Sequence, residues 1–218
     1  LMQKIKDENP TANIKYNIDL DDPTKNDPSI WLDGQGQGKE YIFRRECEQD
    51  RLWSLSFMNN ANLKTLNIGH AYTLRSLNLD GTGVTTVDLS NNLPKLDFMS
   101  TQFTQISSLD FSKNPRLYRL MASYSGLKTL NVKQNPELEL LDLKDTKLTS
   151  LDVTENKKLT WITISSPNIE FIDLSKNTNL NHIEVEGSPK LTKVRIHQKT
   201  VDAIGNQGKW GPMRPEYT

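Results

Sequence analysis

Histidine, the side chain most often used as a general base or metal ligand near neutral pH, occurs three times in this chain. His70, His182 and His197 are too far apart in the sequence to form a local metal-ligand motif. Serine and aspartate are abundant, but no histidine lies where the sequence predicts contact with a nucleophile, as a catalytic triad requires. We therefore expect neither a metal site nor an active site, and the predicted function is not enzymatic.

Two loop segments carry residues that suggest a ligand. Gly34–Lys39 reads Gly-Gln-Gly-Gln-Gly-Lys, but a phosphate-binding loop needs glycine in place of Asp33 and serine or threonine in place of Glu40. The carboxylates within Asp19–Asp22 could gather calcium, yet Pro23 breaks the ligand spacing and the glycine position of an EF-hand loop. Both segments are better explained as turns, so we expect no cofactor.

The overall charge of the chain is balanced, with 27 Lys and Arg residues against 27 Asp and Glu residues. Such a chain has no strong net field to attract nucleic acid or an anionic membrane. No apolar run approaches the roughly 18 residues of a membrane-spanning helix, so membrane insertion is not expected. Cys47 is the single cysteine, which excludes an intramolecular disulfide, and we expect it to be a buried structural thiol.

The elements that must position any surface site are set by a repeat with the spacing Leu-x-x-Leu-x-Leu. All three anchors are apolar each time, although only 35% of the chain is hydrophobic. In the fourth repeat the anchors are Leu93, Leu96 and Phe98. The repeats begin at residues 63, 74, 84, 93, 106, 117, 127, 138, 148, 159, 169, 180 and 191. Counting from residue 63, every second repeat begins 21 or 22 residues further on, so one solenoid coil carries two repeats on opposite walls, with all anchors pointing inward.

The residue three positions past each repeat distinguishes the two walls. On one wall, here called the Asn wall, it is Asn92, Asn114, Asn135, Asn156 and Asn177. On the other, the Thr/Ser wall, it is Thr82, Thr101, Ser125, Thr146, Pro167 and Ser188. Polar side chains at bends can bond to backbone groups that the turn leaves unpaired. Because an amide both donates and accepts, we expect each asparagine to bond to both neighbouring coils in a ladder.

Units such as Leu148–Asn156 (Leu-Thr-Ser-Leu-Asp-Val-Thr-Glu-Asn) and Ile172–Asn177 resemble the short bacterial class of leucine-rich repeats, in particular internalin J-like proteins and surface proteins of Bacteroidetes. The resemblance implies a mostly β solenoid with irregular coils of 21–22 residues and two short parallel strands per coil. It also implies a secreted or cell-surface bacterial protein, although no signal peptide is visible in this chain. The cysteine column of internalin J-like repeats is replaced here by Leu, Ala, Ile or Val.

The repeat divides the chain into three parts. Residues 1–51 form an N-terminal segment and cap, residues 52–200 form the solenoid, and residues 201–218 form a C-terminal cap or tail. Open ends would expose the apolar interior and strand edges, so both ends need covering. Trp31, Phe43 and Trp53 could plug the first coil, while Val201, Ile204 and Trp210 could close the last one. The coil at 84–105 has uneven spacing, which we interpret as a loop insertion around residues 100–105.

The Thr/Ser wall is the expected binding face, because its tight bends resemble those that follow the concave strands of longer leucine-rich repeats. Period-two alternation turns every second strand residue outward. The outward residues form two expected columns, namely Ser76, Lys95, Arg119, Leu140, Trp161 and His182, and Asn78, Asp97, Met121, Asp142, Thr163 and Glu184. Aromatic residues, Met and Arg are enriched at protein interfaces. The predicted partner-binding residues are therefore Arg119, Met121, Leu140, Trp161 and His182.

Two functions of different kinds fit this sequence. The favoured one is a monomeric binding module that presents a strand face to a protein or glycan partner at the bacterial surface. The alternative is a scaffold or spacer segment of a larger surface protein, with no ligand of its own. An exposed Trp161 favours binding, whereas isolated apolar residues occur on every protein surface and would fit the spacer.

Overall fold

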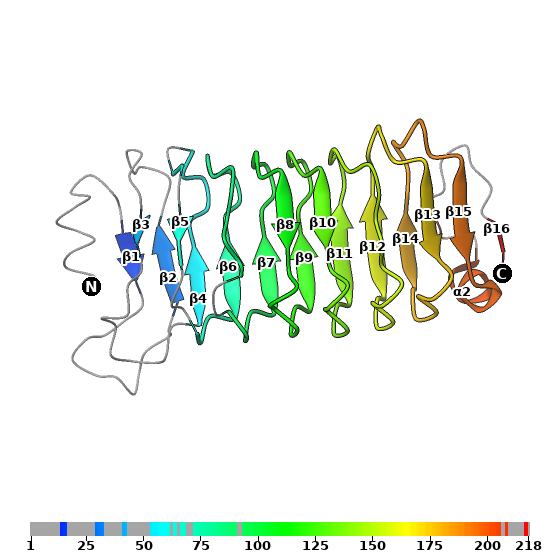
Figure 1. Cartoon of the computed structure of the whole chain (residues 1–218), viewed down its shortest axis with the longest axis horizontal. Coiled ribbons are helices and arrows are strands. Elements are labelled where there is room, and N and C mark those ends of the chain that lie inside the picture. Colours follow the sequence, from blue (N-terminus) through cyan, green and yellow to red (C-terminus); the bar gives the residue numbers. More distant parts are fainter. Residues whose placement is uncertain are drawn as a thin grey trace.

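The computed structural model shows coils stacked along one axis, with strands β1 and β16 at its two ends (Figure 1). It describes residues 14–16, 29–32 and 41–42 as strands, and then residues 53–61, 63–64, 66–68, 72–90, 93–205, 208 and 216–217. Consecutive coils contribute neighbouring strands, so each wall of the stack is a sheet built across the coils. This arrangement is the solenoid that the repeat predicts.

The Thr/Ser wall carries the longer sheet, which has nine strands among the described residues. Its strands pair in parallel from coil to coil, apart from the antiparallel pair β1–β2 at the N-terminal edge. In spatial order they are β1 (Ile14–Tyr16), β2 (Ser29–Leu32), β4 (Ser54–Ser56), β6 (Ser76–Asn78), β7 (Phe98–Ser100), β9 (Arg119–Met121), β11 (Leu140–Leu143), β12 (Trp161–Ile164) and β14 (His182–Glu184). A continuous sheet holds its outward side chains in fixed columns, which a binding face requires. The concavity expected of this wall stays a prediction.

The Asn wall is less regular. Its strands form three short sheets, made by β3 (Tyr41–Ile42) with β5 (Leu66–Asn67), β8 (Ser108–Asp110) with β10 (Thr129–Asn131), and β13 (Phe171–Leu174), β15 (Lys193–Ile196) and β16 (Glu216–Tyr217). Residues 82–90 and 144–160 contain no strand, although the repeats that begin at Val84 and Leu148 bury those first anchors. The expectation of two strands in every coil therefore holds only in places on this wall.

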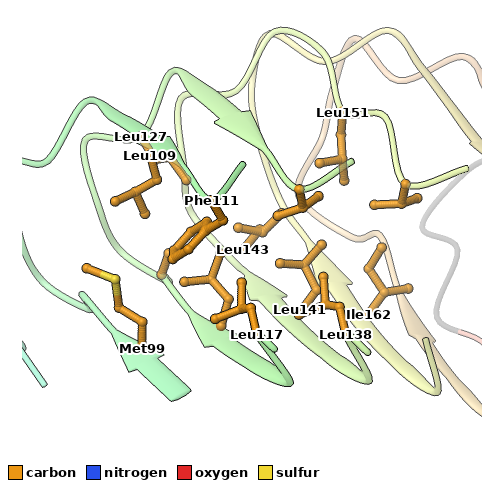
Figure 2. Packing of buried hydrophobic residues seen from close by; sticks show 14 of the residues in the cluster. Met99, Leu109, Phe111, Leu117, Leu127, Leu138, Leu141, Leu143, Leu151 and Ile162 are labelled. Atoms are coloured by element: carbon orange, nitrogen blue, oxygen red, sulfur yellow. The ribbon is translucent and has the colours of Figure 1, made fainter. Parts of the chain in front are cut away.

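The repeat anchors of both walls meet in one apolar interior. In β11 the burial alternates, so that Leu141 and Leu143 point inward while Leu140 and Asp142 are half-buried on the outside. Phe111 from the Asn wall and Met99 from the Thr/Ser wall both point into the space between the walls (Figure 2). Each coil packs its interior mainly against its two neighbouring coils.

The register of the fourth repeat differs from the sequence prediction. Met99 pairs with Leu77 on one side and Leu120 on the other, so the anchors of this repeat are Leu96, Met99 and Thr101. The predicted triplet of Leu93, Leu96 and Phe98 is wrong, because apolar Phe98 occupies an outward position and polar Thr101 an inward one. With this register the starts on the wall become 74, 96 and 117, so the expected loop insertion at residues 100–105 is also wrong.

The asparagine ladder exists, but it runs in one direction. Each amide nitrogen of Asn135, Asn156 and Asn177 donates to two carbonyl oxygens of the preceding coil, 21 and 24 residues earlier. The side-chain oxygens of these asparagines are buried and have no hydrogen-bond partner among the described residues. The prediction that each amide bonds to both neighbouring coils is therefore wrong. The backbone carbonyl of each asparagine carries the ladder onward instead.

Leu93 takes the ladder position that the sequence assigned to Asn92. Asn114 donates to the carbonyl of Leu93 at 3.1 Å, and Leu96 N–H bonds to the same carbonyl, as Leu117 N–H does to that of Asn114. The coil therefore contains one extra residue between Leu89 and Leu93. A buried Leu93 supplies the backbone acceptor without offering an amide of its own.

The hydroxyl groups at the bends of the Thr/Ser wall act within their own coil. Thr82, Thr104, Ser125 and Thr146 each donate to the backbone carbonyl three residues earlier. Thr104, and not Thr101, is the member of this series in the fourth repeat. These bonds satisfy the last inward residue's carbonyl at the point where the strand turns away, which fixes the bend.

The C-terminal end replaces the next coil by helix α2 (Gln198–Ile204). Ile204 is buried in the core, and Thr200 Oγ1 lies 3.4 Å from the carbonyl oxygen of Asn177, where it extends the ladder with a hydroxyl. His197 caps the helix by accepting from Lys199 N–H. No helix within the described residues is long and apolar enough to cross a membrane.

Several expectations for the ends fall outside the described residues or differ from the structure. Phe43, Cys47 and Trp210 lie outside them, and Trp31 is described only as part of strand β2. Trp53 has 54% of its surface exposed, so it does not plug the first coil. The division into an N-terminal segment, a solenoid and a C-terminal tail at 51 and 200 stays a prediction.

Candidate binding surface

The structure brings the five predicted partner-binding residues together. The strand register places Arg119, Leu140, Trp161 and His182 side by side in one column across β9, β11, β12 and β14. Met121 lies two residues along β9 from Arg119 and pairs with Asp142. Arg119 and Trp161 are exposed, whereas the other three are half-buried. The five side chains therefore share one face of the nine-stranded sheet.

Phe98 belongs to the same column, which sequence reasoning missed. It pairs with Ser76 on one side and Arg119 on the other, while Ser100 occupies the second column. The predicted members Lys95 and Asp97 are wrong, because they come from the slipped register of the fourth repeat. We call Phe98, Arg119, Met121, Leu140, Trp161 and His182 together the Trp161 patch.

Trp161 is held in a fixed orientation by its neighbours. Its ring stacks on the imidazole of His182, with ring centroids 3.4 Å apart and planes 12° from parallel. Its indole Nε1 donates to Thr163 Oγ1 at 3.1 Å, so the one donor of the ring is already used within the sheet. His182 therefore covers one face of the indole, while 40% of the surface of Trp161 stays exposed.

Charged groups of both signs lie within the patch and at its border. Arg119 lies over the ring of exposed Tyr118, with its guanidinium carbon 5.3 Å from the ring centroid. Glu184 at the end of the second column forms an ion pair with Lys144 at 3.5 Å. The Tyr124 phenol and, after it, the Glu184 carboxylate raise the pKa of Lys144, so this amine is charged at neutral pH. The patch thus combines an apolar centre with a mixed-charge border.

Two exposed aromatic residues at the far ends of β7 and β9 were also missed by sequence reasoning. Phe103 and Tyr124 stand where other coils have Gly81, Asp145 or Gly187, and both have positive φ angles. The signal was present in the sequence, since an aromatic residue replaces a typical turn residue two positions past the third anchor. For Phe103 it could be read only with Thr101 in the correct register.

Comparison with solved structures identifies this architecture. The functional domain of internalin J from Listeria monocytogenes, which includes a cysteine ladder, matches with a TM-score of 0.55 and 23% sequence identity. The leucine-rich repeat domain of APL1B matches with a TM-score of 0.52 and 16% identity. The chain has the leucine-rich repeat fold. No family model matches the chain, and no curated protein matches it either.

The likeness concerns a part of each of these proteins. It covers 83% of this leucine-rich repeat chain but 38% of the internalin J chain, and 77% of this chain but 57% of the APL1B chain. At these identities the likeness shows the fold alone. Within the described ranges, no group of three or more His, Cys, Asp or Glu side chains is placed to hold a metal ion.

Proposed function

We propose that this leucine-rich repeat domain is a non-enzymatic binding module whose Thr/Ser wall engages a partner protein through the Trp161 patch. The observation that carries the proposal is the unbroken column of Phe98, Arg119, Leu140, Trp161 and His182 on adjacent strands. Trp and Arg are the residue types that most often dominate binding energy, and here they stand on rigid strands.

A protein suits the patch better than a glycan does. A sugar ring needs the open face of an aromatic ring and free polar groups at its border. At Trp161 one face is covered by His182 and the indole N–H is bonded to Thr163. Apolar edges of Phe98, Met121 and Leu140 fit side chains of a folded partner instead.

Secretion or attachment at a bacterial surface and a monomeric state are part of the same proposal. The surface location rests on the resemblance of the repeats to surface leucine-rich repeat proteins. The monomeric state rests on the Trp161 patch, which is formed by one chain alone. Fractionation of the producing cells and light scattering of the purified chain test these two points. The alternative, a spacer segment without a ligand, differs in leaving the Trp161 patch unused.

The central experiment compares Trp161→Ala with Phe171→Ala. Phe171 is an exposed aromatic residue on the Asn wall, with 41% of its surface accessible, and so is a matched control. Partners captured by cross-linking to the chain are identified, and their affinity is then measured by calorimetry. Trp161→Ala should weaken binding by about 2 kcal/mol or more, while Phe171→Ala should change it little. Both variants should melt close to the unaltered chain.

The result that contradicts this proposal is equally specific. If Trp161→Ala lowers the melting temperature and leaves every measured affinity unchanged, the tryptophan only shields the sheet. If cross-linking finds no partner on the Thr/Ser wall, the spacer function is the better account.

A further inference from the structure

The charges of this chain are balanced overall but are divided unevenly over the solenoid. The Thr/Ser wall from β4 to β14 is taken here from the first anchor of each coil to the bend after its strand. Among the described residues of this wall, the carboxylates are Asp80, Asp97, Glu139, Asp142, Asp145, Glu184 and Glu186, and the cations are Arg75, Arg119 and Lys144. In the rest of residues 63–205, Lys and Arg outnumber Asp and Glu instead. The wall that carries the Trp161 patch is therefore the acidic side of the solenoid.

Ion pairs neutralise only part of this acidic wall. Asp97 pairs with Arg75, whose Nε donates to Asp97 Oδ2 at 2.7 Å. Glu184 pairs with Lys144 at 3.5 Å. No ion pair among the described residues involves the other carboxylates of the wall, namely Asp80, Glu139, Asp142, Asp145 and Glu186. Cations of a partner can therefore pair with them.

Residues with carboxylates border Trp161 in the neighbouring coils. Asp142 in β11 and Glu184 in β14 lie on either side of Thr163, whose Oγ1 accepts the indole N–H of Trp161 at 3.1 Å. Glu139, directly before β11, lies next to Trp161, because its carbonyl oxygen accepts from the backbone N–H of Trp161 at 3.0 Å. Arg119, the cation in the same column, is two coils away. The exposed indole thus has an acidic border.

A second aromatic surface on this wall has acidic neighbours in the same way. Phe103 and Tyr124, at the bends after β7 and β9, stack with ring centroids 4.9 Å apart and planes 1° from parallel. Phe103 has 61% and Tyr124 43% of its surface exposed. In the preceding coil, Asp80 Oδ1 accepts from the backbone N–H of Gln102 at 2.7 Å, next to Phe103. Asp145 occupies the equivalent bend of the following coil, so acidic residues stand on both sides of the stack.

The stack is held outward at a cost to the backbone. Phe103 and Tyr124 both have a φ of 56°, a region that glycine occupies without strain, as Gly81 does at the equivalent bend. Strained residues and exposed apolar surface both concentrate at functional sites. A contact with a partner therefore explains the two rings better than local folding does.

We propose that the partner protein presents a basic surface to the Thr/Ser wall, with Arg and Lys side chains around an apolar centre. This inference rests on the proposed function, because it names the kind of protein that the Trp161 patch binds. Strands β7 and β9 carry Phe98 and Arg119 of the patch and end at the stack of Phe103 and Tyr124, so one partner can cover both. An arginine suits an aromatic ring with acidic neighbours, since its guanidinium stacks on the ring and pairs with a carboxylate. An acidic partner is disfavoured by repulsion between like charges.

A phage library of random peptides is the probe for this inference. The library is selected on the purified chain after removal of phage that bind Trp161→Ala, so that peptides attracted by charge alone are discarded. We expect the remaining peptides to have a positive net charge, with Arg or Lys next to apolar residues. One of them is synthesised, and its association rate is measured by surface plasmon resonance. Raising the ionic strength from about 0.1 M to about 1 M shortens the screening length from about 10 Å to about 3 Å and should slow association by about tenfold or more.

Glu139→Gln and Glu170→Gln compare the two walls with variants matched in position. Each glutamate directly precedes a strand, β11 on the Thr/Ser wall and β13 on the Asn wall, and its carbonyl oxygen accepts from a threonine N–H of the next coil. Glu139→Gln and Asp142→Asn should each weaken binding of the peptide by about two- to fivefold and reduce its dependence on salt. Glu170→Gln should change neither. Both glutamate variants should melt as the unaltered chain does, because the backbone bonds are kept.

Three results would overturn the basic partner. The Trp161-dependent peptides could be neutral or acidic, salt could leave the association rate unchanged, or Glu170→Gln could weaken binding as much as Glu139→Gln does. In each of these cases the binding function of the Trp161 patch still stands. If no peptide distinguishes the unaltered chain from Trp161→Ala, the proposed function fails, and this inference fails with it.

Discussion

At the scale of single residues, Thr101 is the least expected feature of the interior. It occupies the position of a third anchor, has no exposed surface, and its hydroxyl has no hydrogen-bond partner among the described residues. Its neighbours in the adjacent coils are Leu79 and the small Ala122, so this part of the interior holds less side-chain volume on the Thr/Ser wall. Phe111, fully buried on the opposite wall, points into the interior between the walls (Figure 2).

Replacing this hydroxyl by a methyl group tests whether it is truly unpaired. Thr101→Val should raise the free energy of unfolding by about 1 kcal/mol, because it removes a buried polar group without changing the shape of the side chain. Thr104→Val is the matched control, since that hydroxyl donates to the Thr101 carbonyl at 2.7 Å and its loss should cost about 1 kcal/mol. Denaturant titration of the two variants measures the change in the free energy of unfolding, which should be positive for Thr101→Val and negative for Thr104→Val. Destabilisation by Thr101→Val would mean that the hydroxyl has an important partner.

At the scale of elements, the asparagine ladder should contribute more stability than its exposed surroundings. Asn135→Ala removes two buried bonds to the preceding coil, to the carbonyls of Phe111 and Asn114, and leaves each carbonyl with only its backbone N–H donor. We expect a loss of about 1–3 kcal/mol in the free energy of unfolding. Gln134→Ala, at the exposed neighbouring position, should stay within about 0.5 kcal/mol. Equal effects of the two changes would show that the ladder contributes nothing.

Most of the fold could be predicted from the sequence, because the same apolar spacing recurs in coil after coil and each occurrence indicates the same inward positions. The fourth repeat could not be, because Phe98 supplied an apolar residue at a plausible spacing while Thr101 hid the true third anchor. Only the pairing of Met99 with Leu77 and Leu120 decides between the two registers. That slip placed Lys95 in the binding column instead of Phe98. A local apolar pattern does not show which of two overlapping triplets aligns with the strands of the adjacent coils.

The candidate sites differ in how far the sequence could lead to them. Arg119, Leu140, Trp161 and His182 are spaced by whole coils, so strand periodicity alone brings them into line. The stack of Phe103 and Tyr124 depends on the backbone conformation of two bends, which the repeat does not encode. The sequence could not predict the direction of the asparagine hydrogen bonds either. A carboxamide has both donors and an acceptor, so the sequence does not decide which neighbouring coil it bonds to.

At the scale of the whole molecule, stability should be a sum over neighbouring coils, with the ends as the weakest parts. Ile204→Asp places a charge at the buried end of helix α2 and should loosen the C-terminal coils first. Hydrogen exchange should then become faster in β14 and β15 and stay unchanged in β6 and β7. Ala203→Asp, on the exposed side of the same helix, is the control. Uniformly faster exchange in all coils would indicate a single cooperative unit instead.

The one-way ladder also sets an order in time. Asn135, Asn156 and Asn177 each donate only to a coil that precedes them in the sequence. A ribosome adds about 5–20 residues per second, so a coil of this length emerges over about one to four seconds, long after local folding steps are complete. Each new asparagine then meets carbonyl groups that are already in place. We therefore expect the finished coils to serve as a template for the next one, so that the chain folds in the direction in which it is translated.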